Sequence, residues 1–233
     1  MDKYKIISGS VLKTIALIAM LIDHIAAFFL QDSSNIILRI GTKQLTNYSL
    51  MRIIGRIAFP IYCFLLVEGF VHTKNRKDYG LRLFLFALIS EIPWNLAHSG
   101  SVLYPKQNVF FTLLFGYLGM CSINKLEETE YRDTVSVVEL LALLLCSIVC
   151  NADYGCKGFA FILMLYVLRK KALVKSVIGA CILPSKWAGL AFFPIALYND
   201  KRGYIKDGKL SLLFYSVYPL HFLVIWLIKG NLA

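Results

Sequence analysis

Long apolar stretches separated by short charged connections dominate this sequence. Of its 233 residues, 58% are hydrophobic and 17% are charged, and the charges cluster between the apolar stretches. Because a helix of about 20 apolar residues spans the hydrocarbon core of a bilayer, several such stretches indicate a polytopic membrane protein. We predict an all-α fold, a membrane helix bundle of roughly 8–9 transmembrane or re-entrant helices, in a single domain over residues 1–233.

Charged and polar interruptions place the individual spans. The predicted spans cover residues 11–30, 53–72, 81–97, 109–123, 135–150, 156–169 and 210–228. Residues 172–198 are long enough for one span, but Pro184, Lys186 and Trp187 divide them into two short halves. The 22-residue connection from Gln31 to Arg52 is expected to form an ordered outer loop or an interfacial helix.

The distribution of Lys and Arg sets the expected orientation. Cytoplasmic connections of membrane proteins are rich in these residues. The connections at 74–77 and 169–175 are strongly basic, and both lie inside if the N-terminus, with Lys3, Lys5 and Lys13, lies inside. We therefore expect the cytoplasmic (inner) membrane and a cytoplasmic N-terminus. Lys and Arg in cytoplasmic connections also account for the net charge of +11. We therefore expect the lipid bilayer as the partner of this chain and predict no nucleic-acid partner.

The six cysteines are used as small apolar residues. Five of them lie within or at the ends of apolar segments, and no Cys-x-x-Cys pair occurs. Cysteine in such segments behaves as a small hydrophobe. The sequence therefore predicts no metal or redox site.

The first span, LKTIALIAMLIDHIAAFFL, carries a basic residue and a histidine on one face. Lys13 and His24 are eleven residues apart, which returns to within about 20° of the same face and separates them by roughly 16 Å along the axis. Asp23 and His24 interrupt the apolar run, so we expect this span to be retained and not cleaved as a signal peptide. A histidine within a membrane span is costly and indicates function, although hydrogen bonding to a nearby carbonyl is the simpler alternative.

Charged residues that need a partner within the protein occur in the first three predicted spans. Asp23 points about 100° away from His24, so we expect it to pair with a cation on another helix, for which Arg52, Arg56 and Arg82 are candidates. Arg56 paired with Glu91 would be a purely structural solution. In the functional interpretation, Glu91 orients His24 or takes a proton from the acceptor.

The expected orientation brings polar groups toward the outer ends of their spans. They are Asp23, His24, Glu91, Gln107, Asn108, Asp153 and Tyr154. Of these, Gln107, Asn108, Asp153 and Tyr154 are predicted to bind an acceptor or an oxyanion, although Asp and Asn near Gly are also ordinary loop formers. His221, a second histidine within a predicted span, joins the predicted substrate-binding residues.

Six strings in register resemble the TraX family, polytopic proteins named for the acetylase of a conjugative pilin amine. The strings are LKTIALIAMLIDHIA, GRIAFPIYCFLLVEGF, RLFLFALISEIPWN, QNVFFTLLFG, ADYGCKGFAFI and FYSVYPLHFL. The resemblance implies an integral membrane acyltransferase domain that uses acetyl-CoA as co-substrate and a peptide or other envelope molecule as acceptor. The spacing of Lys13 and His24 is also similar to a basic-x10-His signature of membrane acyltransferases that modify surface glycans.

The resemblance implies roles for particular residues. Acetyl-CoA would enter from the cytoplasm, with its acetyl end at His24, where Glu91 and Asp23 complete the predicted catalytic set. The predicted residues for its nucleotide end are Lys13, Arg56, Arg76, Lys77 and Arg82. Two positions depart from the family pattern: Ala26 stands where a glycine is expected and Asn95 where a carboxylate is expected. Asn95 is therefore assigned no proton transfer.

Two other classes of membrane protein are alternatives to an acyltransferase. A transporter or ion-coupled membrane protein would use buried Asp23, Glu68, Glu91 and Arg56 as a proton or substrate path. An intramembrane protease is formally matched by the string EETEYR at 127–132, but that string falls in a polar connection. The sequence leaves the identity of the acceptor open, and also whether the chain forms a homodimer.

Overall fold

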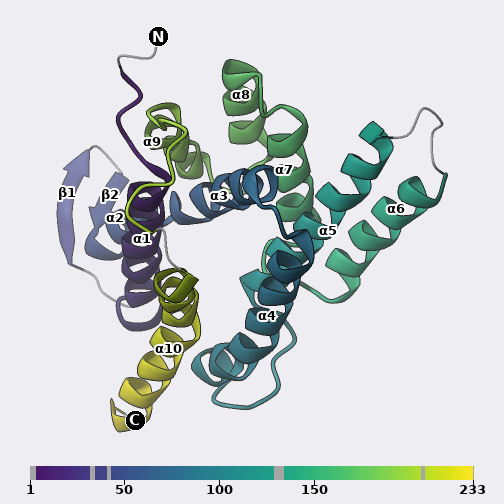
Figure 1. Ribbon diagram of the computed structural model, residues 1–233. Coiled ribbons are helices and arrows are strands. Elements are labelled where there is room, and N and C mark those ends of the chain that lie inside the picture. The colour runs from purple at the N-terminus through teal and green to yellow at the C-terminus, as the bar shows by residue number, and fades with distance from the viewer. Residues whose placement is uncertain (1–3, 32–34, 41–42, 129–133, 206–207, 233) are drawn as a thin grey trace. The chain divides into compact units, whose positions relative to one another are not determined.

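The computed structural model describes residues 4–31, 35–40, 43–128, 134–205 and 208–232. Most of them are helical (Figure 1), which confirms the predicted all-α class. The helices are α1 (Gly9–Phe29), α2 (Asn47–Gly55), α3 (Ala58–His72), α4 (Arg76–Ser99), α5 (Val109–Glu128), α6 (Thr134–Val149), α7 (Gly155–Val167), α8 (Ala172–Ile182), α9 (Phe192–Ala196) and α10 (Gly208–Leu232), with a 3₁₀ helix, η2, at Lys186–Ala191. Positions 129–132 of the protease-like string lie outside the described residues.

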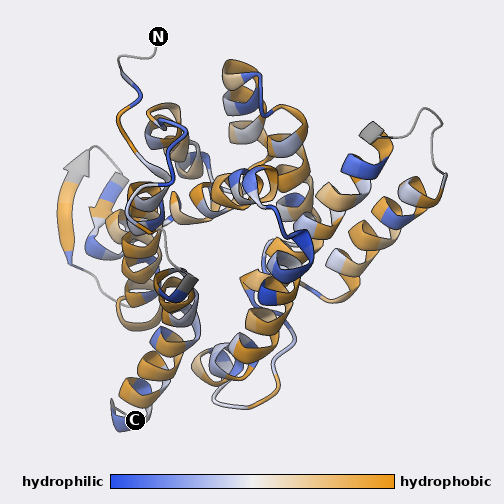
Figure 2. Ribbon diagram, in the orientation of Figure 1, coloured by the Kyte–Doolittle hydropathy of each residue, from blue (hydrophilic) through white to orange (hydrophobic). Residues whose placement is uncertain are grey.

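Within the described ranges, five helical spans are long and apolar enough to cross a membrane by length and composition. They are Gly9–Phe29, Asn47–His72, Arg76–Ser99, Val109–Leu126 and Lys209–Asn231. Helices α6, α7 and α8 are apolar but shorter, with 16, 13 and 11 residues. Figure 2 shows apolar residues along the helices and hydrophilic ones gathered at their ends and connections. Large apolar side chains such as Leu141 and Leu145 on α6 are 62% and 60% exposed, as expected for a lipid-facing surface.

The two halves predicted within residues 172–198 are present. Helix α8 ends at Ile182, and η2 and α9 follow as separate short helices. Leu183 has an extended backbone, with φ −63° and ψ 137°. Proline disfavours helical geometry in the residue before it, so Pro184 explains why the helix stops here.

The span predicted at 53–72 begins earlier and is divided. It starts at Asn47, and α2 ends at Gly55 before α3 begins at Ala58. Pro60 has no backbone N–H and so cannot donate to the carbonyl of Arg56 four residues before it. Proline is tolerated in the first turn of a helix, and this places Pro60 near the start of α3.

The connection before α2 contains a β-hairpin, which the sequence analysis did not predict. Strands β1 (Ile36–Ile40) and β2 (Lys43–Thr46) pair antiparallel, with Ile40 opposite Lys43. The apolar run of β1 lacks the strict alternation that identifies a half-buried strand. Thr46 then begins α2 through a capping box with Ser49, in which each side chain accepts from the other residue's backbone N–H.

The described chain divides into two compact units. Unit 1 contains Met1–Leu65 and Pro184–Ser211, and unit 2 contains Leu66–Leu183 and Leu212–Ala233. In unit 1, the segment that follows α9 is bonded to the start of α1, because Gly9 and Ser10 donate their N–H groups to the carbonyls of Lys201 and Arg202 at 2.8 and 2.9 Å. An N-terminal segment and a segment from late in the sequence therefore build one unit.

Unit 2 contains close helix contacts made possible by glycine. A Cβ atom at Gly116 on α5 would overlap the side chain of Ile162 on α7. Aromatic side chains fill the space nearby, with the ring of Phe70 centred 5.5 Å from Tyr117 and 5.3 Å from Tyr166. Small residues allow helix backbones to approach closely, which is how helices pack within a bilayer.

Gly116→Ala is expected to destabilise unit 2, because the added methyl group must displace Ile162 from a fully packed position. Overpacking of this kind costs about 1–3 kcal/mol. The midpoint of thermal unfolding in detergent should fall. Loss of the monodisperse size-exclusion peak with temperature measures this midpoint. Gly230→Ala is the matched control, since nothing lies within 4 Å of a Cβ there. An equal response of the two variants would contradict this account of the contact.

Candidate functional site

Helix α1 carries the predicted basic residue and histidine of unit 1. It runs without interruption from Gly9 to Phe29 and begins at Ser8, whose hydroxyl accepts from the N–H of Val11. An unbroken helix keeps Lys13 and His24 within about 20° of one face and roughly 16 Å apart along the axis. Both side chains are half-buried.

Lys13 and His24 have different surroundings. Lys13 Nζ donates to Ser211 Oγ at 3.4 Å. The next residue, Thr14, donates to the carbonyl of Ser10 and shares a short hydrogen bond with the hydroxyl of Tyr204. His24 lies edge-on to Phe28, with ring centroids 6.5 Å apart. The lysine end therefore contacts polar groups of the 198–211 segment, whereas the histidine has an aromatic neighbour.

Asp23 is paired with Arg52, one of the three cations proposed as its partner. Arg52 Nη1 lies 2.7 Å from Asp23 Oδ2 and also donates to the Asp23 carbonyl at 3.3 Å. The Asp23 and Arg52 side chains are 15% and 22% exposed, and Asp23 Oδ1 is buried without a hydrogen-bond partner among the residues that the structure describes. The charge of Arg56 also acts on this carboxylate. A Cβ at Gly55 would overlap Asp23, so the close approach of α1 and α2 depends on this glycine.

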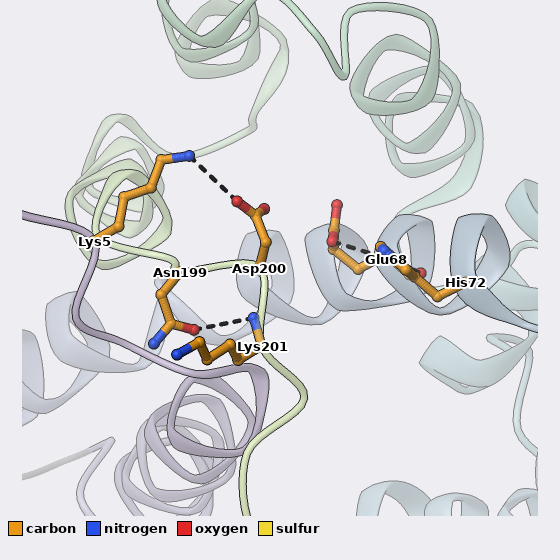
Figure 3. A network of polar contacts seen from close by, with 6 residues as sticks. All are labelled: Lys5, Glu68, His72, Asn199, Asp200 and Lys201. Carbon is orange, nitrogen blue, oxygen red and sulfur yellow. Dashed lines mark hydrogen bonds and ion pairs between the residues drawn. The ribbon is translucent and has the colours of Figure 1, made fainter. Parts of the chain in front are cut away.

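The start of α1 is held by a second polar network in unit 1. Figure 3 shows Lys5 paired with Asp200 at 3.2 Å and the N–H of Lys201 donating to Asn199 Oδ1 at 3.0 Å. These groups are largely exposed, with side-chain exposures of 41% for Lys5 and 66% for Asp200. Ion pairs of this kind contribute little to stability, so the buried Asp23–Arg52 pair is the stronger constraint on α1.

In unit 2, Glu91 on α4 is bonded to Asn108, which precedes α5. Asn108 donates to Glu91 Oε2 through Nδ2 at 2.6 Å and through its backbone N–H at 3.3 Å. Its Nδ2 also donates to the carbonyl of Ala87 at 2.8 Å, and its Oδ1 accepts from the N–H of Phe110 at 3.0 Å. Asn108 is 0% exposed. Its amide therefore caps the start of α5 and also bonds to α4, which ties these two helices together.

Other predicted acceptor-binding residues lie beside this pair. Gln107 forms a parallel bridge with Ala152, and its N–H donates to the carbonyl of Asn151 at 3.1 Å. The N–H of Tyr154 donates to Thr112 Oγ1 at 3.4 Å. The charges of Asp153 and Glu91 also act on the same buried residue, Tyr218. Unit 2 thus brings together Glu91, Gln107, Asn108, Asp153 and Tyr154, which the sequence places in three separate segments; we call these five residues the unit 2 polar cluster.

Tyr218 belongs beside this cluster, although the sequence analysis did not select it. Its hydroxyl accepts from the N–H of Val109 at 3.4 Å, and the charges of Asp153 and Glu91 both act on it. The side chain is buried, at 6% exposure. The string FYSVYPLHFL contained Tyr218, but a buried tyrosine in an apolar helix is indistinguishable from ordinary core without its neighbours.

The two histidines of α4 and α10 bond to their own helices. His221 Nδ1 lies 3.0 Å from the carbonyl of Val217, and His98 Nδ1 lies 2.8 Å from the carbonyl of Trp94. The His98 ring stacks on Tyr104 with centroids 5.4 Å apart and lies tilted against Trp94 at 3.9 Å. His98 was not among the predicted residues, because its position at a helix end is unremarkable in the sequence.

Two of the three arginines assigned to the nucleotide end of acetyl-CoA lie on α4 of unit 2, and the third, Arg56, follows α2 in unit 1. Arg76 stacks over Phe70 at 4.5 Å and donates to Asn124 Oδ1 at 3.2 Å, and Arg82 lies 5.7 Å from the ring of Tyr79. Lys77 is exposed in the first turn of α4. Such stacking holds a guanidinium in one orientation while its N–H groups can still donate.

Glu68 is bonded within its own helix. Figure 3 shows His72 beside Glu68 on α3. His72 Nδ1 lies 2.9 Å from the Glu68 carbonyl and 3.8 Å from its carboxylate.

The predicted site residues fall in both units. Lys13, Asp23, His24 and Arg56 belong to unit 1, and the remaining predicted residues belong to unit 2. The expected pairing of Glu91 with His24, or with Arg56, joins residues of different units and stays a prediction.

Comparison with known proteins decides the family. The family model described as TraX protein matches residues 8–229, which include most of both units. The chain belongs to the TraX family. This TraX-family chain, with its five membrane-length helical spans in the described ranges, is a multi-pass membrane protein.

Two relatives extend the comparison. A probable fimbrial assembly protein FimC, serogroup H1, of Dichelobacter nodosus is 29% identical over 240 residues, which cover 90% of this chain and 91% of that protein. An uncharacterized protein of Rickettsia prowazekii is 26% identical over 162 residues, which cover 68% of this chain and 54% of that protein. No solved structure matches the chain.

Arg52→Ala is expected to destabilise this TraX-family protein strongly, because it leaves the largely buried Asp23 carboxylate without its ion pair. Removing one partner of a buried pair costs about 3–5 kcal/mol. The thermal midpoint in detergent measures the loss. Lys5→Ala, which breaks the exposed pair with Asp200, serves as the control and should shift the midpoint little. A small shift for Arg52→Ala would mean that the Asp23 pair does not hold α1.

Proposed function

We propose that this TraX-family protein is a membrane-embedded acetyltransferase. It moves an acetyl group from cytoplasmic acetyl-CoA to an amine or hydroxyl of an acceptor on the outer side of the inner membrane. The observation that carries the proposal is the arrangement of Lys13 and His24 on one face of a single unbroken helix of membrane length. An extended co-substrate lying along that face would contact both residues.

In the proposed reaction, His24 acts as general base. The acceptor nitrogen or oxygen attacks the thioester carbonyl while His24 takes its proton, the carbon–sulfur bond breaks, and the thiolate of CoA leaves and is protonated. Asp23 is bonded to Arg52, and this supports a role in holding α1 and His24 in place, in preference to proton transfer. Attack by His24 itself, giving an acetyl-histidine intermediate, is the alternative route.

Basic residues support binding of the nucleotide end of acetyl-CoA. Lys13, Arg56, Arg76, Lys77 and Arg82 are the proposed set. Arginine and lysine are the residues that bind phosphate groups in proteins. Arg76 is exposed, and its stacking over Phe70 orients its guanidinium.

The unit 2 polar cluster is proposed to bind the acceptor through Glu91, Gln107, Asp153 and Tyr154. Its residues come from the connections before α5 and α7 and from α4, and they supply both hydrogen-bond donors and carboxylates. The name of the Dichelobacter nodosus relative, a probable fimbrial assembly protein, supports an acceptor that belongs to a surface fibre. We therefore propose a peptide or other envelope molecule as acceptor.

His24→Ala is expected to abolish acetyl transfer, since general-base catalysis contributes about 100- to 10,000-fold to a rate. The measurement is incorporation of radiolabel from labelled acetyl-CoA into cell envelopes that lack the native gene and contain the variant at matched amounts. His72→Ala, at the largely exposed end of α3, is the control and should retain activity. Wild-type envelopes that incorporate no more label than envelopes without the protein would overturn the proposed function and favour a transporter.

Lys13→Ala is expected to raise the KM for acetyl-CoA about tenfold, as loss of one charge-assisted contact of roughly 1.4 kcal/mol predicts. The same envelope assay at varied acetyl-CoA concentration measures it, and kcat should change little. Lys157→Ala, an exposed lysine of α7, is the matched control. A fall in kcat with an unchanged KM would place Lys13 away from the nucleotide.

A further inference from the structure

Asn108 is fully committed to contacts within the protein. Its two amide hydrogens have acceptors in Glu91 Oε2 and the Ala87 carbonyl, and its amide oxygen caps α5 at Phe110. With 0% exposure, the side chain has no surface on which to receive a substrate. Its earlier assignment to acceptor binding therefore does not fit the geometry.

Glu91 is bonded through only one of its two oxygens. Both hydrogen bonds from Asn108 reach Oε2, whereas Oε1 is buried and has no hydrogen-bond partner in the described part of the chain. A buried carboxylate oxygen without a donor is costly, and such atoms in native proteins are found where a ligand or water binds. Two donors on Oε2 fix the plane of the carboxylate and hence the direction of Oε1.

The same part of α4 has two further unsatisfied polar atoms. Ser90 Oγ and Asn95 Oδ1 are buried without a hydrogen-bond partner in the described ranges, and their residues are 0% and 4% exposed. Pro93 lies between them within the helix and removes one backbone donor. Three unsatisfied buried oxygens within six residues favour a polar ligand over ordinary lipid-facing helix packing.

We infer that Asn108 is a positioning residue that holds the Glu91 carboxylate so that Oε1 accepts a hydrogen bond from the N–H or O–H group of the acceptor. The inference rests on the proposed acetyltransferase function and adds to it the atom to which the acceptor binds. Glu91 then touches the substrate, and Asn108 acts only through Glu91. Oε1 only accepts this hydrogen bond and removes no proton, so no additional reactant is required.

The test is a double-mutant cycle on the initial rate of label transfer to envelopes at saturating acetyl-CoA. Asn108→Ser keeps a hydroxyl that can cap α5 but is too short to reach Glu91. Glu91→Gln is expected to lower the rate about 100-fold, as weakening of a hydrogen bond to a charged group predicts, and Asn108→Ser about tenfold. If Asn108 acts through Glu91, the double variant should be no slower than Glu91→Gln alone, since coupled residues are not additive. The KM for acetyl-CoA should stay unchanged throughout.

Asn108→Asp gives a second, nearly isosteric variant. It keeps the cap on α5 but offers no side-chain N–H to Glu91 and adds a negative charge, so it should lose at least as much rate as Asn108→Ser while its elution profile in detergent stays monodisperse. The inference is overturned if Asn108→Ser loses the same factor in the Glu91→Gln background, or if neither Asn108 variant is slowed while the wild type is active. An inactive wild type would instead overturn the proposed function and, with it, the inference.

Discussion

The absence of water in a bilayer core is the constraint on which this structure depends. Every charge within an apolar helix must find its partner inside the protein. Asp23 meets this requirement through Arg52, and Glu91 meets it in part through Asn108. Each of these contacts joins two segments of chain, so the residues that resemble a catalytic set also fix how the helices of their unit pack.

The two units provide partners for their buried carboxylates in different ways. In unit 1, a largely buried ion pair and Gly55 hold α1 against α2, while the 197–202 segment is bonded to the start of α1. In unit 2, the side-chain amide and the backbone N–H of Asn108 donate to one oxygen of the Glu91 carboxylate. Each carboxylate keeps one buried oxygen without a hydrogen-bond partner among the described residues, but the charge of Asp23 is balanced by Arg52, whereas Glu91 has neutral donors from Asn108. This difference is why Glu91 is the better candidate for contact with a substrate.

The sequence was most informative where one local rule applies. The apolar runs located the long helices, Pro184 divided residues 172–198 into two halves, and the spacing of Lys13 and His24 required only that α1 be unbroken. The sequence was least informative where the structure depends on contacts between separate segments. The hairpin at Ile36–Thr46 depends on contact between two short strands, and Tyr218 gains its surroundings only from α5 and the Asp153 loop.

The sequence by itself determined that this is a helical membrane protein of the TraX family, because hydropathy and ordered motifs are properties of the chain read one segment at a time. Only the tertiary structure decided that Arg52, among three candidate cations, binds Asp23. It also decided that Asn108 is buried against Glu91 and not presented to a substrate. Such partners are chosen by distances between segments, and no periodicity within one segment encodes those distances.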